Sequence, residues 1–265
     1  QQNKRQIFRE FKIGKLIHLI MLDTRQYGRD KQLQPKDYLS ESGFNQAKFY
    51  NDLNSKNREL LGAEQLSWIE NSVLKSNAAW TIFGQQVLMA KLKFPDISKM
   101  LKTEEIPNFL KPYLKFLGLG IPSNLDAWDG YPAARNSLYK LMKNAKKKFI
   151  SLAGDTHNSW VSELENQSGK KVGIELGAPS VTSPGITDIL NLDQNKFVDS
   201  IVKINKELQW MDPSNRGYLF LNCMENKIIA SFNFIKELDN INSEISSSQS
   251  FVIYREGLEL KEIKA

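Results

Sequence analysis

Residues 148–160 read KFISLAGDTHNSW and contain the clearest change from strand to loop in the chain. The apolar run 149–153 is short and bounded by polar residues, which is typical of a strand in a sheet covered on both faces. The run stops at Gly154, which lets the backbone turn tightly. Asp155 and His157 follow at once, and the chain has only two histidines. A carboxylate and an imidazole therefore stand directly after a predicted buried strand.

The segments before this stretch predict strands and helices in alternation. Apolar runs at 16–22 and 80–92 predict two more buried strands, and the second is interrupted near 84–86. Apolar residues at helical spacing predict helices over 62–76 and 132–148. Strands that alternate with helices in this way indicate a layered α/β protein.

The last third of the chain predicts antiparallel strands. A short strand begins near 171, and a helix occupies much of 187–206. Two hairpins follow, the first over 217–235 and the second around Glu256-Gly257.

Two long segments lack these patterns. Residues 29–58 are polar, and we expect a loop there. Residues 94–125 carry four prolines around short apolar groups. We interpret 94–125 as a lid or as an insertion at the edge of the sheet.

Composition and charge exclude several classes of protein. The apolar fraction of 41% supports a packed globular chain, and the formal charge of +6 is not gathered into a stripe that would bind nucleic acid. The densest basic run, 143–148, lies at the end of a predicted helix, where cations suit the helix dipole. Cys223 is the one cysteine, which excludes an internal disulfide. No apolar segment reaches the ~20 residues that a membrane-spanning helix needs.

The D-x-H pattern of Asp155 and His157 has two interpretations. After a strand of an open α/β sheet, both side chains can point into a cleft, where a carboxylate and an imidazole suit a mixed or dinuclear metal site. Alternatively, Asp155 caps a helix and His157 is solvated. The pattern alone leaves both interpretations open. His18, inside a predicted strand, is interpreted as a buried and hydrogen-bonded histidine rather than as a ligand.

Six stretches taken in order are more informative than the D-x-H pattern. They are LIMLDTRQY (19–27), RELLGAEQLSWIENSVLKSNAAWTIFGQQVLMAKL (58–92), DAWDGYPAARNSLYKLM (126–142), FISLAGDTHNSW (149–160), GIELGAPSVTSPG (173–185) and NKELQWMDPSNRGYLFLN (205–222). This ordered set resembles the alkaline phosphatase D (PhoD-like) family of calcineurin-type metallophosphatases. The resemblance extends over most of residues 7–235.

The resemblance implies a fold, an activity and cofactors. The family has an αββα four-layer sandwich, hydrolyses phosphate monoesters and diesters, holds iron and calcium ions, and is usually exported by the twin-arginine route. Its G-D-x-H motif falls on Gly154, Asp155 and His157, so the resemblance implies Asp155 and His157 as catalytic metal ligands. Arg25, after the first predicted strand, is interpreted as a substrate-binding contact to phosphate. A surface arginine or a structural ion pair fits Arg25 equally well.

Further metal ligands of the family are not found in this sequence. Members carry an upstream cysteine, a G-D motif with a nearby tyrosine, and a D-D-H-E-type stretch, and none of these precedes the matched motifs here. We therefore expect 1–265 to be the carboxyl-terminal part of one metallophosphatase domain, without its N-terminal half. Such a fragment would be inactive alone, because two ligands do not hold a dinuclear cluster against water. It would also expose apolar sheet surface and be poorly soluble.

The main alternative is a non-catalytic, secreted binding domain that kept the fold without the ligands. Retention of both Asp155 and His157 favours the enzyme. Many family members have histidine where this chain has Glu207, so that position is a candidate support for the site. Asp129 is interpreted as fixing its own loop, and the hydroxyl-rich segment 180–183 as satisfying its own backbone. The sequence leaves the ester preference and the oligomeric state open.

Overall fold

The computed structural model describes residues 6–95, 97, 116, 119–122, 124–190, 192–240 and 242–263. Its centre is a seven-stranded sheet in which β2, β5, β6 and β8 are parallel, whereas β1 and β7 are antiparallel to their neighbours. In spatial order the strands are β1 (Arg9–Ile13), β2 (Ile17–Met21), β5 (Trp80–Gln85), β6 (Phe149–Ala153), β8 (Lys171–Gly177), β7 (Ser159–Glu165) and β9 (Leu208–Asp212).

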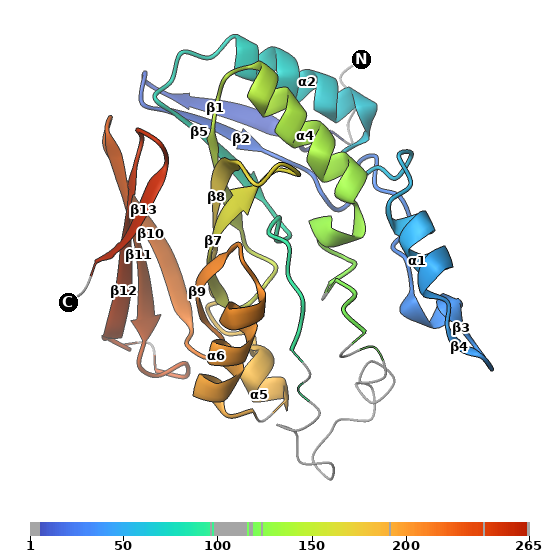
Figure 1. Ribbon diagram of the computed structural model, residues 1–265. Coiled ribbons are helices and arrows are strands. Elements are labelled where there is room, and N and C mark those ends of the chain that lie inside the picture. The colour runs from blue at the N-terminus through green and yellow to red at the C-terminus, as the bar shows by residue number, and fades with distance from the viewer. Residues whose placement is uncertain are drawn as a thin grey trace.

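Helices cover one face of this sheet (Figure 1). They are α2 (Gly62–Leu74), α4 (Pro132–Asn144) and α6 (Gln194–Ile204), with the short α5 (Ile186–Leu190) before α6. Each long helix turns apolar residues inward, including Ile69 of α2, Leu138 of α4 and Phe197 of α6, which belong to one buried cluster. The predicted helices over 62–76, 132–148 and 187–206 are therefore confirmed, the last as two helices.

A four-stranded antiparallel sheet packs on the other face of the large sheet (Figure 1). Its strands are, in order, β10 (Gly217–Cys223), β11 (Lys227–Ile235), β12 (Ile245–Tyr254) and β13 (Glu259–Ile263). Alternate residues of β11, such as Ile228 and Phe232, are buried against Ile82 and Ile150 of the large sheet. Both predicted hairpins are confirmed.

The two covered faces explain why the central strands read as uninterrupted apolar runs. In β6, Phe149 joins the helix-side cluster, and its neighbour Ile150 joins the cluster under the smaller sheet. In β5, Phe83 likewise belongs to the helix-side cluster and Ile82 to the cluster under the smaller sheet. The strand predicted over 80–92 ends at Gln85, because the following segment leaves the sheet and forms the wall of a pocket.

The prediction of a loop over 29–58 is wrong. This segment contains the 3-10 helix η1 (Pro35–Tyr38), the ribbon β3 (Leu39–Ser40) and β4 (Gly43–Phe44), and the helix α1 (Gln46–Leu53). Phe49 and Leu53, four residues apart on α1, are buried in a small separate cluster with Tyr38. The cluster uses few apolar residues, so the segment reads as polar overall.

The layers of the described residues are helices, the large sheet and the small sheet. This mixed α/β architecture confirms the expected fold class, whereas a second helical layer outside the small sheet is not found within the described ranges. Most of 94–125 lies outside those ranges, so its interpretation as a lid or insertion stays a prediction. Exposed apolar side chains occur on two edge strands, Phe11 on β1 and Phe220 on β10. None of the described helices has the length and apolar character needed to cross a membrane.

Candidate active site

The carboxyl ends of the neighbouring strands β2, β5 and β6 lie on the same side of the large sheet. Gln86 forms hydrogen bonds with the loops that follow β2 and β6. Its Nε2 donates to Leu22 O at 3.0 Å, and its Oε1 accepts from Thr24 N at 2.8 Å. Its own carbonyl oxygen accepts from Asp155 N at 2.8 Å. Gln86 therefore sets the spacing between the loop after β2 and the loop after β6.

Asp23 shapes the loop after β2. It is fully buried, and its carboxylate accepts from Arg25 N and Gln26 N at 2.9 Å and from Tyr27 N at 3.1 Å. A carboxylate that binds the backbone a few residues ahead fixes a turn. The role of Asp23 is to present Arg25 on this side of the sheet.

Arg25 lies between two carboxylates. Its Nε donates to Asp155 Oδ2 at 2.8 Å, and its Nη1 donates to Asp126 Oδ2. Partial burial lowers the pKa of Arg25, but hydrogen bonds and charge from Asp126 and Asp155 outweigh it, so the pKa is raised overall. The side chains of Arg25, Asp126 and Asp155 remain 35%, 32% and 45% exposed, so solvent reaches all three.

His157 lies two residues beyond Asp155, as the sequence shows, and its side chain is exposed. Its φ of +59° is the left-handed conformation, which histidine adopts more readily than most residues and which is enriched at functional sites. Gly154 is not in that conformation, and a Cβ there would meet nothing within 4 Å. The chain does turn directly after Gly154, at 155–156, but the unusual backbone angle in this turn belongs to His157.

Asp155, His157 and Arg25 line one pocket of about 540 Å³. Asp126 lies on its polar side, and apolar side chains such as Val87, Leu88, Trp160 and Ile186 form other parts of its wall. The structure thus brings together all three site residues that the sequence predicts. A pocket with charged groups at one end and apolar walls suits a ligand that has an anionic head and an organic remainder.

Asp155 and His157 offer one carboxylate and one imidazole toward this pocket. These donors fit a cation of mixed oxygen and nitrogen preference, and both are accessible to solvent. Among the described residues, no group of three or more His, Cys, Asp or Glu side chains is placed to hold a metal ion. The pair therefore fits part of a metal coordination sphere, not a complete one.

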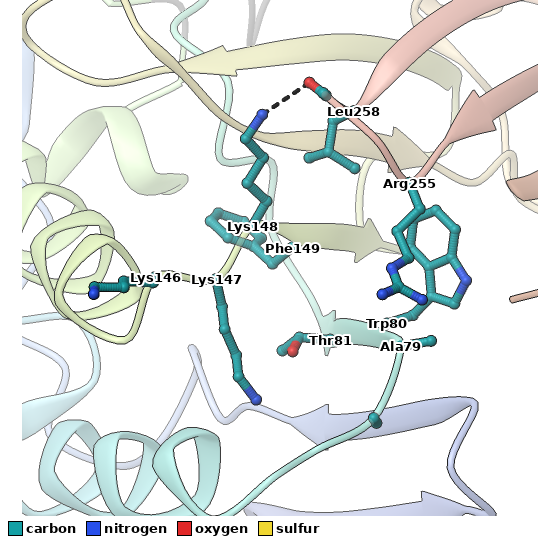
Figure 2. Close-up of a pocket in the computed structure, with 11 residues that line it drawn as sticks. Ala79, Trp80, Thr81, Lys146, Lys147, Lys148, Phe149, Arg255 and Leu258 are labelled. Atoms are coloured by element: carbon teal, nitrogen blue, oxygen red, sulfur yellow. Dashed lines mark hydrogen bonds between the residues drawn. The ribbon is translucent and has the colours of Figure 1, made fainter. Parts of the chain in front are cut away.

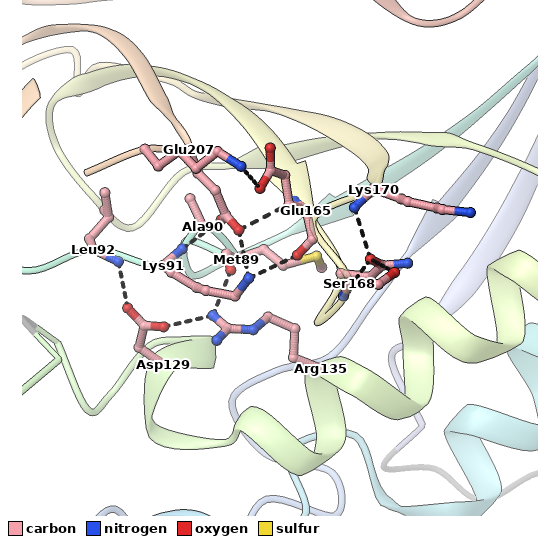
Figure 3. Close-up of polar contacts among 12 residues, drawn as sticks. Met89, Ala90, Lys91, Leu92, Asp129, Arg135, Glu165, Ser168, Lys170 and Glu207 are labelled. Atoms are coloured by element: carbon pink, nitrogen blue, oxygen red, sulfur yellow. Dashed lines mark hydrogen bonds and ion pairs between the residues drawn. The ribbon is translucent and has the colours of Figure 1, made fainter. Parts of the chain in front are cut away.

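The wall of the pocket is continuous with a backbone segment, 89–93, that buried side chains hold in place (Figure 3). Five successive N–H groups of this segment donate to side-chain oxygens: Met89 and Ala90 to Glu175, Lys91 to Glu207, Leu92 to Asp129, and Lys93 to Asn205. Each of these bonds measures 2.7 to 2.9 Å. The segment is not part of a sheet, so these side chains replace the partners that a neighbouring strand would supply.

Two acidic residues of this group carry further contacts. Asp129 also accepts from Arg135 Nη1 at 2.7 Å, and both side chains are buried. Glu175 is completely buried, and desolvation raises its pKa to about 7 although Met89 N, Ala90 N and Ser151 donate to it. These carboxylates are structural.

The remaining sequence interpretations concern residues outside the charged end of the pocket. Asp129 is structural, as expected, but its carboxylate binds Leu92 N and Arg135 rather than its own loop, and the residue also lines the pocket. Glu207 is buried and paired with Lys91 Nζ at 2.8 Å, and it does not line the pocket, so it supports segment 89–93 rather than Asp155. Ser180 Oγ donates to Ser183 O at 2.6 Å, which confirms a loop that satisfies its own backbone. His18 is buried, as predicted, with Glu10 at 2.5 Å from its Nε2, whereas its Nδ1 has no hydrogen-bond partner among the described residues.

Sequence reasoning missed Gln86 and Asp126. Gln86 follows a strand, as Asp155 does, and its place at the end of a buried run is the signal that could have marked it. Asp126 opens the stretch DAWDGYP, but nothing in its neighbours distinguishes it from Asp129. Only the fold shows that Asp126 faces Arg25 and Asp129 faces Arg135.

Comparisons with known proteins show relatives in sequence and in fold. Alkaline phosphatase D of Bacillus subtilis (strain 168) is 29% identical over 265 residues, which cover 98% of this chain and 40% of the relative. A solved structure described as "Structure of PhoD" matches with a TM-score of 0.73 at 26% identity, over 98% of this chain and 44% of that one. The chain thus spans less than half the length of each. A family model described as PhoD-like phosphatase matches residues 1–232, and the chain therefore belongs to the PhoD-like phosphatase family.

Proposed function

We propose that the chain contributes part of the active site of a metal-dependent phosphoesterase that hydrolyses phosphate monoesters or diesters. The observation that carries the proposal is the convergence of Asp155, His157 and Arg25 in one pocket of a PhoD-like phosphatase family member. Family membership supports phosphoester hydrolysis as the reaction, and the pocket supports these residues as participants.

Asp155 and His157 are the residues that would hold metal, iron and calcium by the family resemblance. Such ions, when bound, polarise phosphate oxygens and acidify a bound water. Further ligands would have to come from outside the described residues, because these two supply only part of a coordination sphere.

Arg25 would bind the phosphate group. A planar guanidinium binds phosphate oxygens in pairs, which gives orientation as well as charge. Arg25 donates to Asp126 as well as to Asp155. If a cation bound Asp155, Arg25 would therefore keep Asp126 as a partner at the pocket. Asp126 would then keep the guanidinium aimed at the substrate.

The apolar wall of the pocket supports an ester with an organic alcohol group. Val87, Leu88 and Ile186 would contact that group, while the phosphate faces Arg25 and Asp155. Export of the enzyme is part of the proposal and rests on the family resemblance. The alternative function, a secreted binding domain, would use the same pocket without turnover.

The test is hydrolysis of p-nitrophenyl phosphate and bis-p-nitrophenyl phosphate by the protein expressed from the full reading frame that encodes this chain. We expect Asp155→Asn and His157→Asn each to lower kcat by about a hundredfold or more and to reduce bound metal measured by mass spectrometry. Arg25→Gln should mainly raise KM. Turnover that is undiminished in Asp155→Asn would remove this residue from the site, and binding of both esters without turnover would favour the alternative.

A further inference from the structure

A second pocket lies at the amino ends of the central strands β5 and β6, opposite the candidate active site at their carboxyl ends. Its volume is about 300 Å³, and it is lined by the first residues of β5 and β6, by 146–148 after α4, and by the turn between β12 and β13 (Figure 2). Because β5 and β6 are parallel and their far ends lead to Gln86 and Asp155, the two pockets are separated by the length of these strands. A ligand here would not touch the proposed catalytic residues.

Four cationic residues line this pocket: Lys146, Lys147, Lys148 and Arg255. The Lys146 side chain extends away from the other three (Figure 2). Lys147 Nζ donates to Ser76 O, Lys148 Nζ to Gly257 O at 2.8 Å, and Arg255 Nη1 to Glu225 O at 3.3 Å. These acceptors are backbone carbonyls, which satisfy donors but carry no net charge. Within the part of the chain that the structure describes, none of the four forms an ion pair with a carboxylate.

Helix dipoles account for only part of this charge. The carboxyl ends of α2 and α4 both lie near these lysines, since Ser76 follows α2 and Lys146 follows α4. Each helix end carries roughly −0.5 of an elementary charge. Two ends therefore offset about one of the four positive charges. Arg255 and the partner of Lys148 belong to a β-turn and are not explained by a helix end at all.

The end of α4 leads the chain into the pocket. Lys146 has a φ of +56°, and the bonds Lys146 N to Lys143 O and Lys147 N to Met142 O, both 3.0 Å, close the end of α4 in a Schellman arrangement. The chain then passes directly into Lys147 and Lys148, which line the pocket.

Lys147 is half-buried and has no carboxylate to compensate its charge, and this desolvation lowers its pKa. An anion bound in the pocket would compensate the charge. Below the cations, the pocket is walled by the buried Trp80, Phe149 and Leu258, with Thr81 between them. Figure 2 shows the Lys147 ammonium and the Thr81 hydroxyl on the same side of the pocket.

We propose that this pocket binds a small oligophosphate anion. Several cations that approach one cavity from different elements match a ligand whose charge is spread over more than one group, whereas a single carboxylate would neutralise only one of them. Lysines suit phosphate as point charges, and Arg255 adds a planar donor. The proposal does not depend on the proposed phosphoesterase activity, because the two pockets lie at opposite ends of β5 and β6.

The test is isothermal titration of the protein expressed from the full reading frame with sodium tripolyphosphate at about 0.15 M salt. We expect one bound anion per chain, and affinity that falls by about tenfold or more in Lys147→Gln/Arg255→Gln, since each substitution removes a charged hydrogen bond. The matched control is Lys12→Gln/Lys203→Gln, which removes the same charge from exposed positions outside both pockets. It should change the affinity by less than about twofold, because exposed distant charges are screened by salt.

Lys147 also caps α2, so a second variant guards against loss of folding. Lys148→Gln removes a charge from an exposed side chain that lines the pocket, and its circular dichroism should match that of the parent while its affinity falls. Equal loss in the control variant would overturn the proposal in favour of diffuse charge attraction. Absence of binding would also overturn the proposal. Loss of binding in Arg25→Gln would overturn it by placing the anion in the first pocket. Binding to phosphatidylglycerol vesicles without binding to tripolyphosphate would overturn it as well.

Discussion

Two sets of carboxylates in this protein have opposite surroundings. Glu175 and Asp129 are buried and accept from the backbone of segment 89–93. Asp155 and Asp126 are partly exposed at the candidate active site and accept from the side chain of Arg25. The first set accepts hydrogen bonds from main-chain N–H groups of segment 89–93, and the second accepts hydrogen bonds from a partly exposed guanidinium.

The difference shows which carboxylates are free for chemistry. A buried charge costs several kcal/mol to desolvate, so it is retained only with hydrogen-bond partners, and removing one partner leaves the other uncompensated. An exposed ion pair contributes about 0–1 kcal/mol, so its members can exchange partners for a metal or a phosphate at little cost. Residue type and spacing do not separate the two sets, whereas burial does.

The strongest test of this comparison is Asp129→Ala. Arg135 would remain buried without a carboxylate, and Leu92 N would lose its acceptor. We expect the free energy of unfolding of the chain to fall by about 3–5 kcal/mol, measured by urea denaturation. Asp155→Ala is the matched control and should cost less than about 1 kcal/mol, because its side chain is exposed and Arg25 keeps Asp126 as a partner, whereas Asp126 also pairs with the nearly buried Arg29. Equal losses in the two variants would show that burial does not divide the carboxylates.

The second test uses pH and Glu175. Its folded pKa of about 7 lies above the ordinary value of 4.5, so the folded state binds the proton more tightly than the unfolded state does. The stability from this group is complete below pH 4.5 and is lost as pH rises toward about 7. That loss amounts to about 3 kcal/mol at neutral pH.

Glu175→Gln removes this titration and keeps an oxygen that can accept from Met89 N and Ala90 N. The difference in unfolding free energy between parent and variant should therefore change across pH 4.5 to 7, in the direction that favours the variant as pH rises. A difference that stays constant over this range would mean that Glu175 is not protonated on folding.

Gln86 is intermediate between the two sets of carboxylates in its burial. It is half-buried, and it binds backbone groups of the loops at the candidate site. Gln86→Ala would leave Leu22 O and Thr24 N without their side-chain partner. We expect a loss of about 1–3 kcal/mol in unfolding free energy. Amide hydrogen exchange at Thr24 should accelerate, while exchange at Leu92 should not. Acceleration at both amides would mean that the loops at the site and segment 89–93 open together.

The central strands and long helices could be predicted because burial leaves a pattern in the sequence. Strands β5 and β6 are covered on both faces and read as apolar runs, and α2 and α4 repeat apolar residues at helical spacing. Strand β1 is exposed along its whole length, so it has no apolar pattern to detect. The same reasoning explains why the sequence of α1, which has only two buried residues, predicts a loop rather than a helix.

The candidate site was predictable only where chemistry follows a strand. Asp155, His157 and Arg25 follow buried strands, and the structure brings them together. Asp126 and Gln86 matter because of what the fold places beside them, and no local pattern encodes that. Glu175 lies inside a predicted strand, and its main-chain partners, Met89 and Ala90, are more than 80 residues away in sequence. Its role could therefore not be inferred from its neighbours.

The smallest expected effect on stability is that of Asp155→Asn. Arg25 keeps Asp126 as a partner, Asp155 N keeps its bond to Gln86 O, and the altered side chain is exposed. The free energy of unfolding should therefore change by less than about 0.5 kcal/mol, within the range of ordinary surface substitutions. Set beside Asp129→Ala, this result would show that the protein does not need the Asp155 carboxylate to fold. A loss of several kcal/mol would instead place Asp155 with the structural carboxylates, and any fall in hydrolysis by this variant would then have to be attributed to misfolding rather than to a missing ligand.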